Sequence, residues 1–162
     1  ILKQFENEAN PLAHYKTTGP EIYEDIDGKI DYFISGAGSG GTFTGVMKFL
    51  KEKDENIKGI LADPKGSTMG GGEKEAYDIE GIGNDFIPDT MDMDLVDKVI
   101  KVSDEEAYEM VKLLALKEGL IVGSSSGAAI SVALKLAEKI DKGNIVTILP
   151  DRGDRYFSKN IY

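Results

Sequence analysis

The chain has 162 residues, of which 41% are hydrophobic and 30% are charged, and its formal net charge is −10. This balance is typical of a folded globular protein, and the acidic excess argues against nucleic acid, because phosphate backbones are held by clustered Lys and Arg. The absence of cysteine excludes disulfide scaffolds and thiolate metal sites. No apolar run approaches the roughly eighteen residues of a membrane span. We therefore predict no metal centre, no nucleic-acid or membrane partner, and a cytoplasmic location.

The first predicted element is a helix that begins at the segment 18–21. Thr18 and Glu21 have the spacing of a capping box, and Pro20 lies in the first turn, where its missing N–H costs nothing. The helix should run to about Asp27 and stop at Gly28.

Strands and helices are then predicted to alternate along the chain. The strands are expected at residues 31–35, 57–62, 97–102, 120–122 and 144–149, and the helices at 42–53, 103–117 and 128–140, with a glycine-serine turn at 123–127. Ser103 and Glu106 have the spacing of a second capping box. Such alternation implies parallel strands with right-handed crossovers. We expect one α/β domain over residues 1–162, built on an open, mostly parallel twisted sheet with helices on both faces. The glycine-rich stretch 65–94 is expected to be a long loop of functional importance.

A glycine-rich turn lies between the first predicted strand and the helix that follows it. Residues 36–41 read Gly-Ala-Gly-Ser-Gly-Gly and satisfy the G-x-G-x-x-G pattern. Glycines allow consecutive backbone N–H groups to turn toward one point, and the helix start adds positive charge, so an anion is favoured there. The pattern indicates a phosphate without saying which one, and a tight packing turn is the alternative. Asp63, near the end of the next strand, is either a ribose ligand of a dinucleotide or a turn residue before Pro64.

Several motifs in order resemble the cysteine synthase and cystathionine β-synthase family of fold-type II pyridoxal-phosphate enzymes. The segments that carry the resemblance are Asn10-Pro11, His14-Tyr15, 17–22, 38–42, 80–83, 86–88, 125–127 and 148–151. They cover essentially the whole chain and match the carboxyl-terminal half of that family. The resemblance implies a three-layer, Rossmann-like half of the fold and pyridoxal 5′-phosphate as the cofactor.

The resemblance also implies the roles of particular residues. The loop expected to cradle the cofactor phosphate consists of Gly38, Ser39, Gly40, Gly41 and Thr42, with Ser39 in place of the more usual Thr. Ser125 is expected to meet the pyridine nitrogen, where a hydroxyl does not force a full proton onto the ring; a helix cap is the alternative. Gly81 is expected near the substrate amino group, or else to be a loop glycine that needs positive φ. Asp151 either approaches the ring edge or caps a turn, and His14 is not expected to be a general base.

The family's reactive lysine has no match in this chain. In the family, the lysine that forms the Schiff base and the loop that grips the substrate carboxylate lie in the amino-terminal half. The chain opens without Met, and we expect it to be cut from a longer polypeptide and to be inactive alone, with no catalytic residue of its own.

The expected parent is a homodimer that replaces the β-substituent of O-acetylserine or serine with a sulfur nucleophile. Alternatives are the NAD-binding domain of an oxidoreductase and a non-catalytic anion-binding module.

Overall fold

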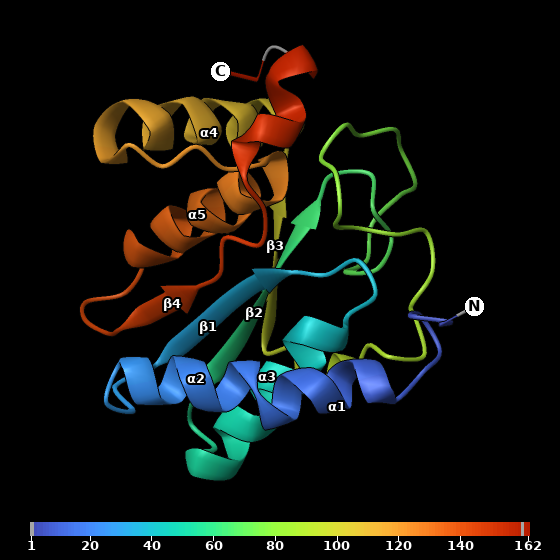
Figure 1. Cartoon of the computed structure of the whole chain (residues 1–162), viewed down its shortest axis with the longest axis vertical. Helices are drawn as coiled ribbons and strands as arrows, with labels where there is room; N and C mark the ends of the chain where they lie inside the picture. Colours follow the sequence, from blue (N-terminus) through green and yellow to red (C-terminus); the bar gives the residue numbers. More distant parts are fainter. Residues whose placement is uncertain (1, 160) are drawn as a thin grey trace.

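A computed structural model describes residues 2–159, 161 and 162 (Figure 1). The α-helices are α1 (Ala9–Lys16), α2 (Thr18–Asp25), α3 (Gly41–Lys53), α4 (Asp104–Glu118) and α5 (Ser124–Ala137). The strands are β1 (Tyr32–Gly36), β2 (Lys58–Pro64), β3 (Lys98–Val102) and β4 (Ile145–Thr147), and short 3-10 helices cover Met93–Leu95 and Gly153–Lys159. No helix in this described part of the chain has the length and apolarity needed to cross a membrane.

The four strands form one parallel sheet in the order β3-β2-β1-β4. Figure 1 shows α4 and α5 on one face of this sheet, and α1, α2 and α3 on the other. The predicted fold class is therefore confirmed, including the helices on both faces. Because all strands run the same way, their carboxyl ends meet at one edge, where ligands of open α/β sheets bind.

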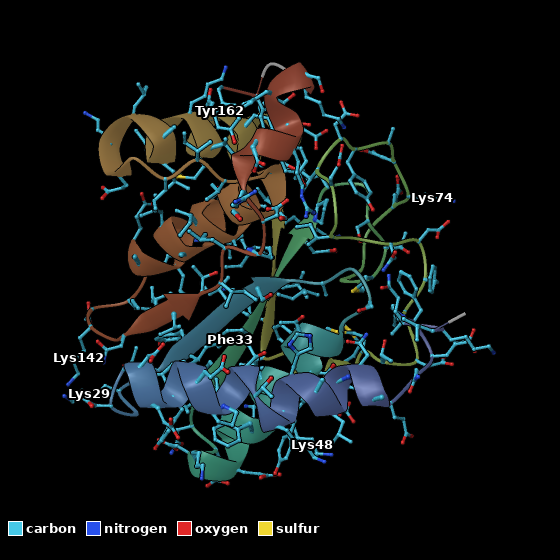
Figure 2. All side chains as sticks on the ribbon, viewed as in Figure 1. Lys29, Phe33, Lys48, Lys74, Lys142 and Tyr162 are labelled. Carbon is cyan, nitrogen blue, oxygen red and sulfur yellow. The ribbon has the colours of Figure 1, made fainter. Side chains whose placement is uncertain are left out.

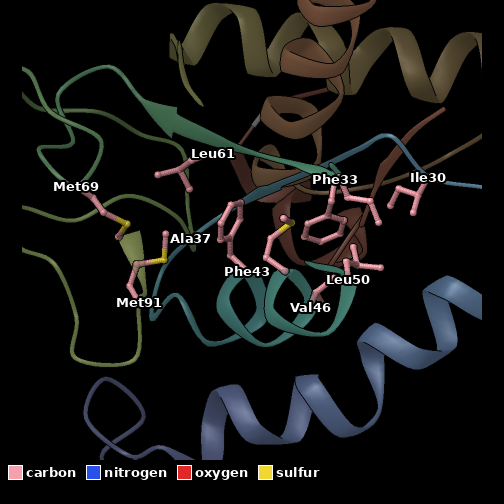
Figure 3. Packing of buried hydrophobic residues seen from close by; sticks show 11 residues of the cluster. Ile30, Phe33, Ala37, Phe43, Val46, Leu50, Leu61, Met69 and Met91 are labelled. Atoms are coloured by element: carbon pink, nitrogen blue, oxygen red, sulfur yellow. The ribbon is translucent and has the colours of Figure 1, made fainter. Parts of the chain in front are cut away.

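Two apolar clusters fill the space on either side of the sheet. On the α3 side, Phe33 and Phe43 are fully buried, with ring centroids 6.2 Å apart (Figure 3). On the α5 side, Ile34 of β1 packs with Val132 of α5, and both are fully buried. Burial of such a side chain stabilises the fold by about 1.5–3 kcal/mol. Two consecutive residues of β1, Phe33 and Ile34, thus pack against the helices on opposite faces of the sheet. This packing holds the carboxyl end of β1 in place.

The start of the chain differs from the prediction. Helix α1 was not predicted, because it buries no side chain of its own and so carries no periodic apolar stripe. Figure 1 shows α1 and α2 lying end to end. The predicted capping box at Thr18 is wrong, since Thr17 is the N-cap and makes no side-chain cap bond. The Thr18 hydroxyl instead pairs with His14, at 2.9 Å from Nδ1.

The region before α5 also departs from the prediction. The expected strand at 120–122 is wrong, because only an isolated antiparallel bridge joins Val122 to Arg152. Helix α5 begins at Ser124 rather than Ala128 and therefore takes in most of the predicted glycine-serine turn. A left-handed glycine, Gly119, ends α4 shortly before it, so little chain remains between the two helices for a strand.

The predicted long loop 65–94 is confirmed, and a buried ion pair holds its start against the sheet. Asp63 at the end of β2 is 1% exposed, and its Oδ2 accepts from Lys101 Nζ of β3 at 2.6 Å and from the Gly70 N–H at 3.0 Å. Lys101 Nζ also donates to the Ser67 carbonyl at 2.6 Å. These bonds fix the loop beside the carboxyl edge of the sheet.

Candidate functional site

A cavity of about 550 Å³ opens at the carboxyl end of β1. It is walled by the glycine loop, by the loop 65–94 and by the first turn of α5. The lining residues with predicted roles are Gly38, Ser39, Gly40, Thr42, Gly81 and Ser125. The size lies within the range of about 300–1,000 Å³ typical of small-molecule sites. Thus six of the seven residues singled out from the sequence line one cavity.

Gly41 is the exception, and it has a packing role. A Cβ atom at Gly41 would collide with the Asn10 side chain of α1. The residue therefore faces the neighbouring helix, although its own N–H lies 3.4 Å from Ser39 Oγ. The glycine requirement at 41 comes from the close approach of α1 to α3.

The glycine loop has its carbonyl groups fixed by the loop 65–94. The Ala37 carbonyl accepts from the Gly83 N–H at 2.8 Å, the Gly38 carbonyl accepts from Asn84 Nδ2, and the Ser39 carbonyl accepts from the Thr90 hydroxyl at 2.6 Å. Each carbonyl is trans to the N–H of the next residue across a planar peptide. The N–H groups of residues 38–40 are thereby directed away from these partners.

Those N–H groups form an anion-binding arrangement. Within the described part of the chain, the N–H groups of residues 38, 39 and 40 have no hydrogen-bond acceptor. Gly40 is the N-cap of α3 with φ +82°, a conformation that favours glycine, and no side chain caps the helix there. Free N–H groups at a helix start bind anions such as phosphate.

The serines at the start of α5 contact neighbouring segments of the chain rather than capping their own helix. The N-cap of α5 is Gly123, and no side-chain cap bond is present, so the cap interpretation of Ser125 is wrong. Ser124 Oγ accepts from the Glu80 N–H at 3.1 Å and ties α5 to the loop that carries Gly81. Ser125 is 5% exposed and lines the cavity. Among the described residues, it is the only one of the three serines that lines this cavity.

Asp151 lies behind these serines. Its Oδ1 is 3.5 Å from both Ser125 Oγ and Ser126 Oγ, and the Tyr156 hydroxyl donates to its Oδ2. Burial, followed by this bond to Asp151, raises the pKa of Tyr156 to about 12. Asp151 therefore organises the start of α5 and does not itself line the cavity described here.

Gly81 satisfies the conformational interpretation given to it. Its φ is +80°, which an L side chain rarely adopts, and a Cβ atom there would meet open space. The backbone at this residue borders the cavity. Contact with a substrate amino group remains a prediction.

Asp63 lacks the freedom that a ribose ligand needs. Its buried carboxylate is held by Lys101 and by the Gly70 N–H, as described above. A dinucleotide site after such a glycine loop relies on an acidic residue at this strand end to bind ribose hydroxyls. The geometry therefore favours the turn interpretation of Asp63 over the nicotinamide interpretation.

Four residues that contact the glycine loop were not predicted from the sequence to have a role at the site. Asn84 and Thr90, which fix the loop carbonyls, lie in a stretch without periodicity and carried no signal. Asn10 and His14 were noted as part of a motif but were assigned no function, and they contact Ser39 and Thr42. None of the lining residues in the described chain is a lysine, and Figure 2 shows the labelled Lys29, Lys74 and Lys142 at the outer edges of the molecule.

Fold and site together define a parallel α/β domain in which free backbone N–H groups at a strand-to-helix turn border a cavity. The family model described as "Pyridoxal-phosphate dependent enzyme" matches residues 1–151. The chain therefore belongs to the pyridoxal-phosphate-dependent enzyme family, whose cofactor is pyridoxal phosphate.

The chain is also similar to individual members of this family. It is 53% identical to the O-acetylserine dependent cystathionine beta-synthase of Bacillus subtilis (strain 168). It is 47% identical to the cysteine synthase of Helicobacter pylori (strain J99). Each of these two matches covers 98% of this chain and 52% of the relative. The crystal structure of the O-acetylserine dependent cystathionine beta-synthase from Helicobacter pylori matches with a TM-score of 0.93 and 46% identity, over 98% of this chain and 52% of that one. The chain thus spans about half the length of these relatives.

Proposed function

We propose that this chain is the cofactor-phosphate-binding part of a β-replacement enzyme of the cysteine synthase or cystathionine β-synthase type. Its substrates would be O-acetylserine or serine and a sulfur nucleophile, in sulfur amino-acid metabolism. The observation that carries the proposal is the shared cavity, which is lined both by residues 38–40, with their free backbone N–H groups, and by Ser125.

The phosphate would be held by the glycine loop. Free N–H groups at the start of α3, the Thr42 and Ser39 hydroxyls, and the positive end of the helix all favour a dianion there. Each charge-assisted bond contributes about 1.5–3 kcal/mol before the costs of ordering. A side chain at position 38 would collide with the Gly81 carbonyl, at 2.5 Å from its Cβ. The glycine is therefore what lets the two loops close around the ligand.

Ser125 would meet the pyridine nitrogen of the cofactor. When bound, pyridoxal phosphate supplies an electron sink that stabilises negative charge on the substrate carbon. The Ser125 hydroxyl can hydrogen-bond the ring nitrogen without imposing a full positive charge, which suits departure of a β-substituent followed by addition of a nucleophile. Gly81 would border the substrate amino group.

The reactive lysine would come from outside this chain. The cavity wall contains no lysine among the described residues, and Lys101 is occupied by Asp63 and the Ser67 carbonyl. The chain alone would therefore be inactive. We propose that the complete protein is a cytoplasmic homodimer in which a preceding segment supplies the lysine and the substrate-carboxylate site.

Binding titrations of the complete protein test the proposal. Pyridoxal phosphate should bind far more tightly than pyridoxal, which lacks the phosphate, and inorganic phosphate should compete with it. NADH should not compete. Specific micromolar NADH binding would favour an oxidoreductase domain, and stabilisation by inorganic phosphate without any affinity for pyridoxal phosphate would favour a plain anion-binding module.

A second experiment tests the missing lysine. The 162-residue chain is mixed with pyridoxal phosphate and dialysed. No visible absorbance band should remain, whereas the complete protein should retain one. A stoichiometric band that survives dialysis of the chain alone would contradict the proposal.

A further inference from the structure

Helix α1 presents two polar side chains to the glycine loop from behind. Asn10 and His14 are four residues apart and so lie on one face of the helix. Asn10 Nδ2 lies 2.9 Å from Ser39 Oγ, and His14 Nε2 lies 3.1 Å from Thr42 Oγ1. Ser39 and Thr42 carry the only hydroxyl groups of the loop 38–42, and both line the cavity. No described residue of α1 lines it.

Glycines in α3 permit this contact. A Cβ atom at Gly41 would collide with the Asn10 amide, and one at Gly45 would collide with the Pro11 carbonyl and lie 2.7 Å from His14 Cβ. Figure 1 shows α1 crossing directly over α3. Two glycines on the face of α3 that meets α1 therefore bring Asn10 and His14 within hydrogen-bond distance of the loop.

The direction of the bond between Asn10 and Ser39 follows from a third group. Asn10 Nδ2 also lies 2.7 Å from the Gln4 carbonyl oxygen, which can only accept, so the amide nitrogen is a donor to both partners. Ser39 Oγ accepts from Asn10 and, at 3.4 Å, from the Gly41 N–H. Both lone pairs of Ser39 Oγ are engaged, so its remaining capacity is to donate its own proton.

His14 makes the corresponding contact with Thr42, with Nε2 at 3.1 Å from Thr42 Oγ1. Burial lowers the pKa of His14, which favours the neutral ring with one N–H. The ring lies between two hydroxyls, with Nδ1 at 2.9 Å from Thr18 Oγ1. If Thr18 donates to Nδ1, the proton is on Nε2, which then donates to Thr42 Oγ1. The Thr42 proton is in that case free to point into the cavity.

We propose that Asn10 and His14 are positioning residues that set the Ser39 and Thr42 hydroxyls as donors toward the cofactor phosphate. This inference rests on the proposed function, because it takes the ligand in the loop to be a phosphate. Neither side chain touches the ligand. Each donates a hydrogen bond to a hydroxyl oxygen on the side away from the cavity. The hydroxyl proton is therefore already directed toward the cavity before the ligand binds, and binding costs less conformational entropy.

The test uses substitutions that change donor character with little change in size. In Asn10→Asp, a carboxylate replaces the amide donor. The carboxylate can only accept, so the Ser39 hydroxyl would donate to it rather than into the cavity, and a negative charge is added next to the loop. In His14→Leu, the ring donor to Thr42 is lost, whereas His14→Gln retains an N–H. The complete protein with Asn10→Asp or His14→Leu should bind pyridoxal phosphate about tenfold more weakly, the equivalent of one hydrogen bond to a charged group. His14→Gln should recover part of the loss.

Pyridoxal binding separates positioning from general damage. Pyridoxal has no phosphate, so its affinity should be unchanged in all three variants, and the 31P resonance of the bound cofactor should shift in Asn10→Asp and His14→Leu. Tyr15→Phe is the matched control, because it removes a hydrogen bond between the same helix and Glu52 without reaching the loop. It should leave both affinities and the 31P resonance unchanged.

The outcomes distinguish this inference from the proposed function. Wild-type protein without affinity for pyridoxal phosphate would overturn the proposed function itself. Variants with wild-type affinity and an unshifted 31P resonance would overturn the positioning roles alone. Equal losses for pyridoxal and pyridoxal phosphate would also overturn them, because they would indicate that α1 only supports the fold.

Discussion

Helices α3 and α4 both begin at the carboxyl edge of the same sheet, yet their amino ends are completed differently. At α4, Ser103 Oγ accepts from the Glu106 N–H at 3.3 Å, and the Glu106 carboxylate accepts from the Ser103 N–H at 2.8 Å. This is the capping box predicted from the sequence. At α3, the N-cap is Gly40, and no side chain caps the helix.

The two helix starts also differ in charge, and this difference again leaves the start of α3 open to an anion. The first turn of α4 contains three acidic residues, whereas that of α3 contains none. Acidic side chains near a helix start satisfy its positive end and repel further anions. A helix start completed by its own side chains is structural, and one left open by glycines beside a cavity is available to a ligand. The cofactor phosphate would cap the start of α3, as the side chains of Ser103 and Glu106 cap the start of α4.

The largest expected effect comes from disturbing the open helix start. In Gly40→Ala, the new Cβ would collide with Met91 in a backbone with φ +82°. We expect affinity for pyridoxal phosphate to fall at least about a hundredfold, because the loop must shift and its N–H groups lose their common direction. Equilibrium titration measures this change. Gly71→Ala is the control, because φ there is +85° with open space around it. It should cost about 1 kcal/mol in stability and leave affinity intact; equal losses of affinity in both variants would contradict the account.

The next effect tests whether the carboxylate at the end of β2 is structural. Lys101→Met removes the partner of Asp63, whose carboxylate is 1% exposed. Breaking a fully buried ion pair costs about 3–5 kcal/mol. Because Lys101 is 29% exposed and water screens the pair, we expect a loss at the lower end of that range, about 3 kcal/mol. Urea unfolding of the variant, with the exposed Lys98→Met on the same strand as control, measures the loss. A variant as stable as the wild type would show that Asp63 does not depend on this pair.

A smaller effect is expected at the ring-nitrogen position. Ser125→Ala should weaken binding of pyridoxal phosphate about fivefold, the equivalent of one ordinary hydrogen bond. Ser126→Ala is a close control, because Ser126 is equally near Asp151, at 3.5 Å, but does not line the cavity. If both substitutions weaken binding alike, the effect comes from Asp151 and the start of α5 rather than from contact with the ring.

The smallest effect is expected at the closed helix start. Ser103→Ala should lower the free energy of unfolding by about 1 kcal/mol, because one cap bond is lost. Affinity for pyridoxal phosphate should not change. Thermal unfolding and titration on the same sample measure both quantities. A loss of affinity without a loss of stability would remove the distinction drawn between α3 and α4.

The sequence predicted those parts of the molecule whose signals are local. Helix α3, strand β1 and the glycine loop follow from glycines, branched residues and polar ends within a few positions of one another. The capping box at Ser103 was correct for the same reason. The one at Thr18 was wrong because α1 runs directly into α2 and leaves no free helix start to cap.

The rest depended on contacts between distant residues. Ser124 bonds to the backbone of Glu80, and Asp151 lies behind Ser125, so the role of these serines could not follow from a cap motif. The strand predicted at 120–122 has apolar residues but only one bridging partner. Asn10 faces Ser39 across 29 positions of sequence, and only the packing of α1 on α3 reveals that contact.

The most direct test is a crystal structure of the complete protein with pyridoxal phosphate. The account predicts phosphate oxygens at about 3 Å from the backbone N–H groups of residues 38–40, with the ring nitrogen beside Ser125 Oγ. A phosphate bound away from the start of α3, or a ring nitrogen that faces a residue other than Ser125, would contradict it.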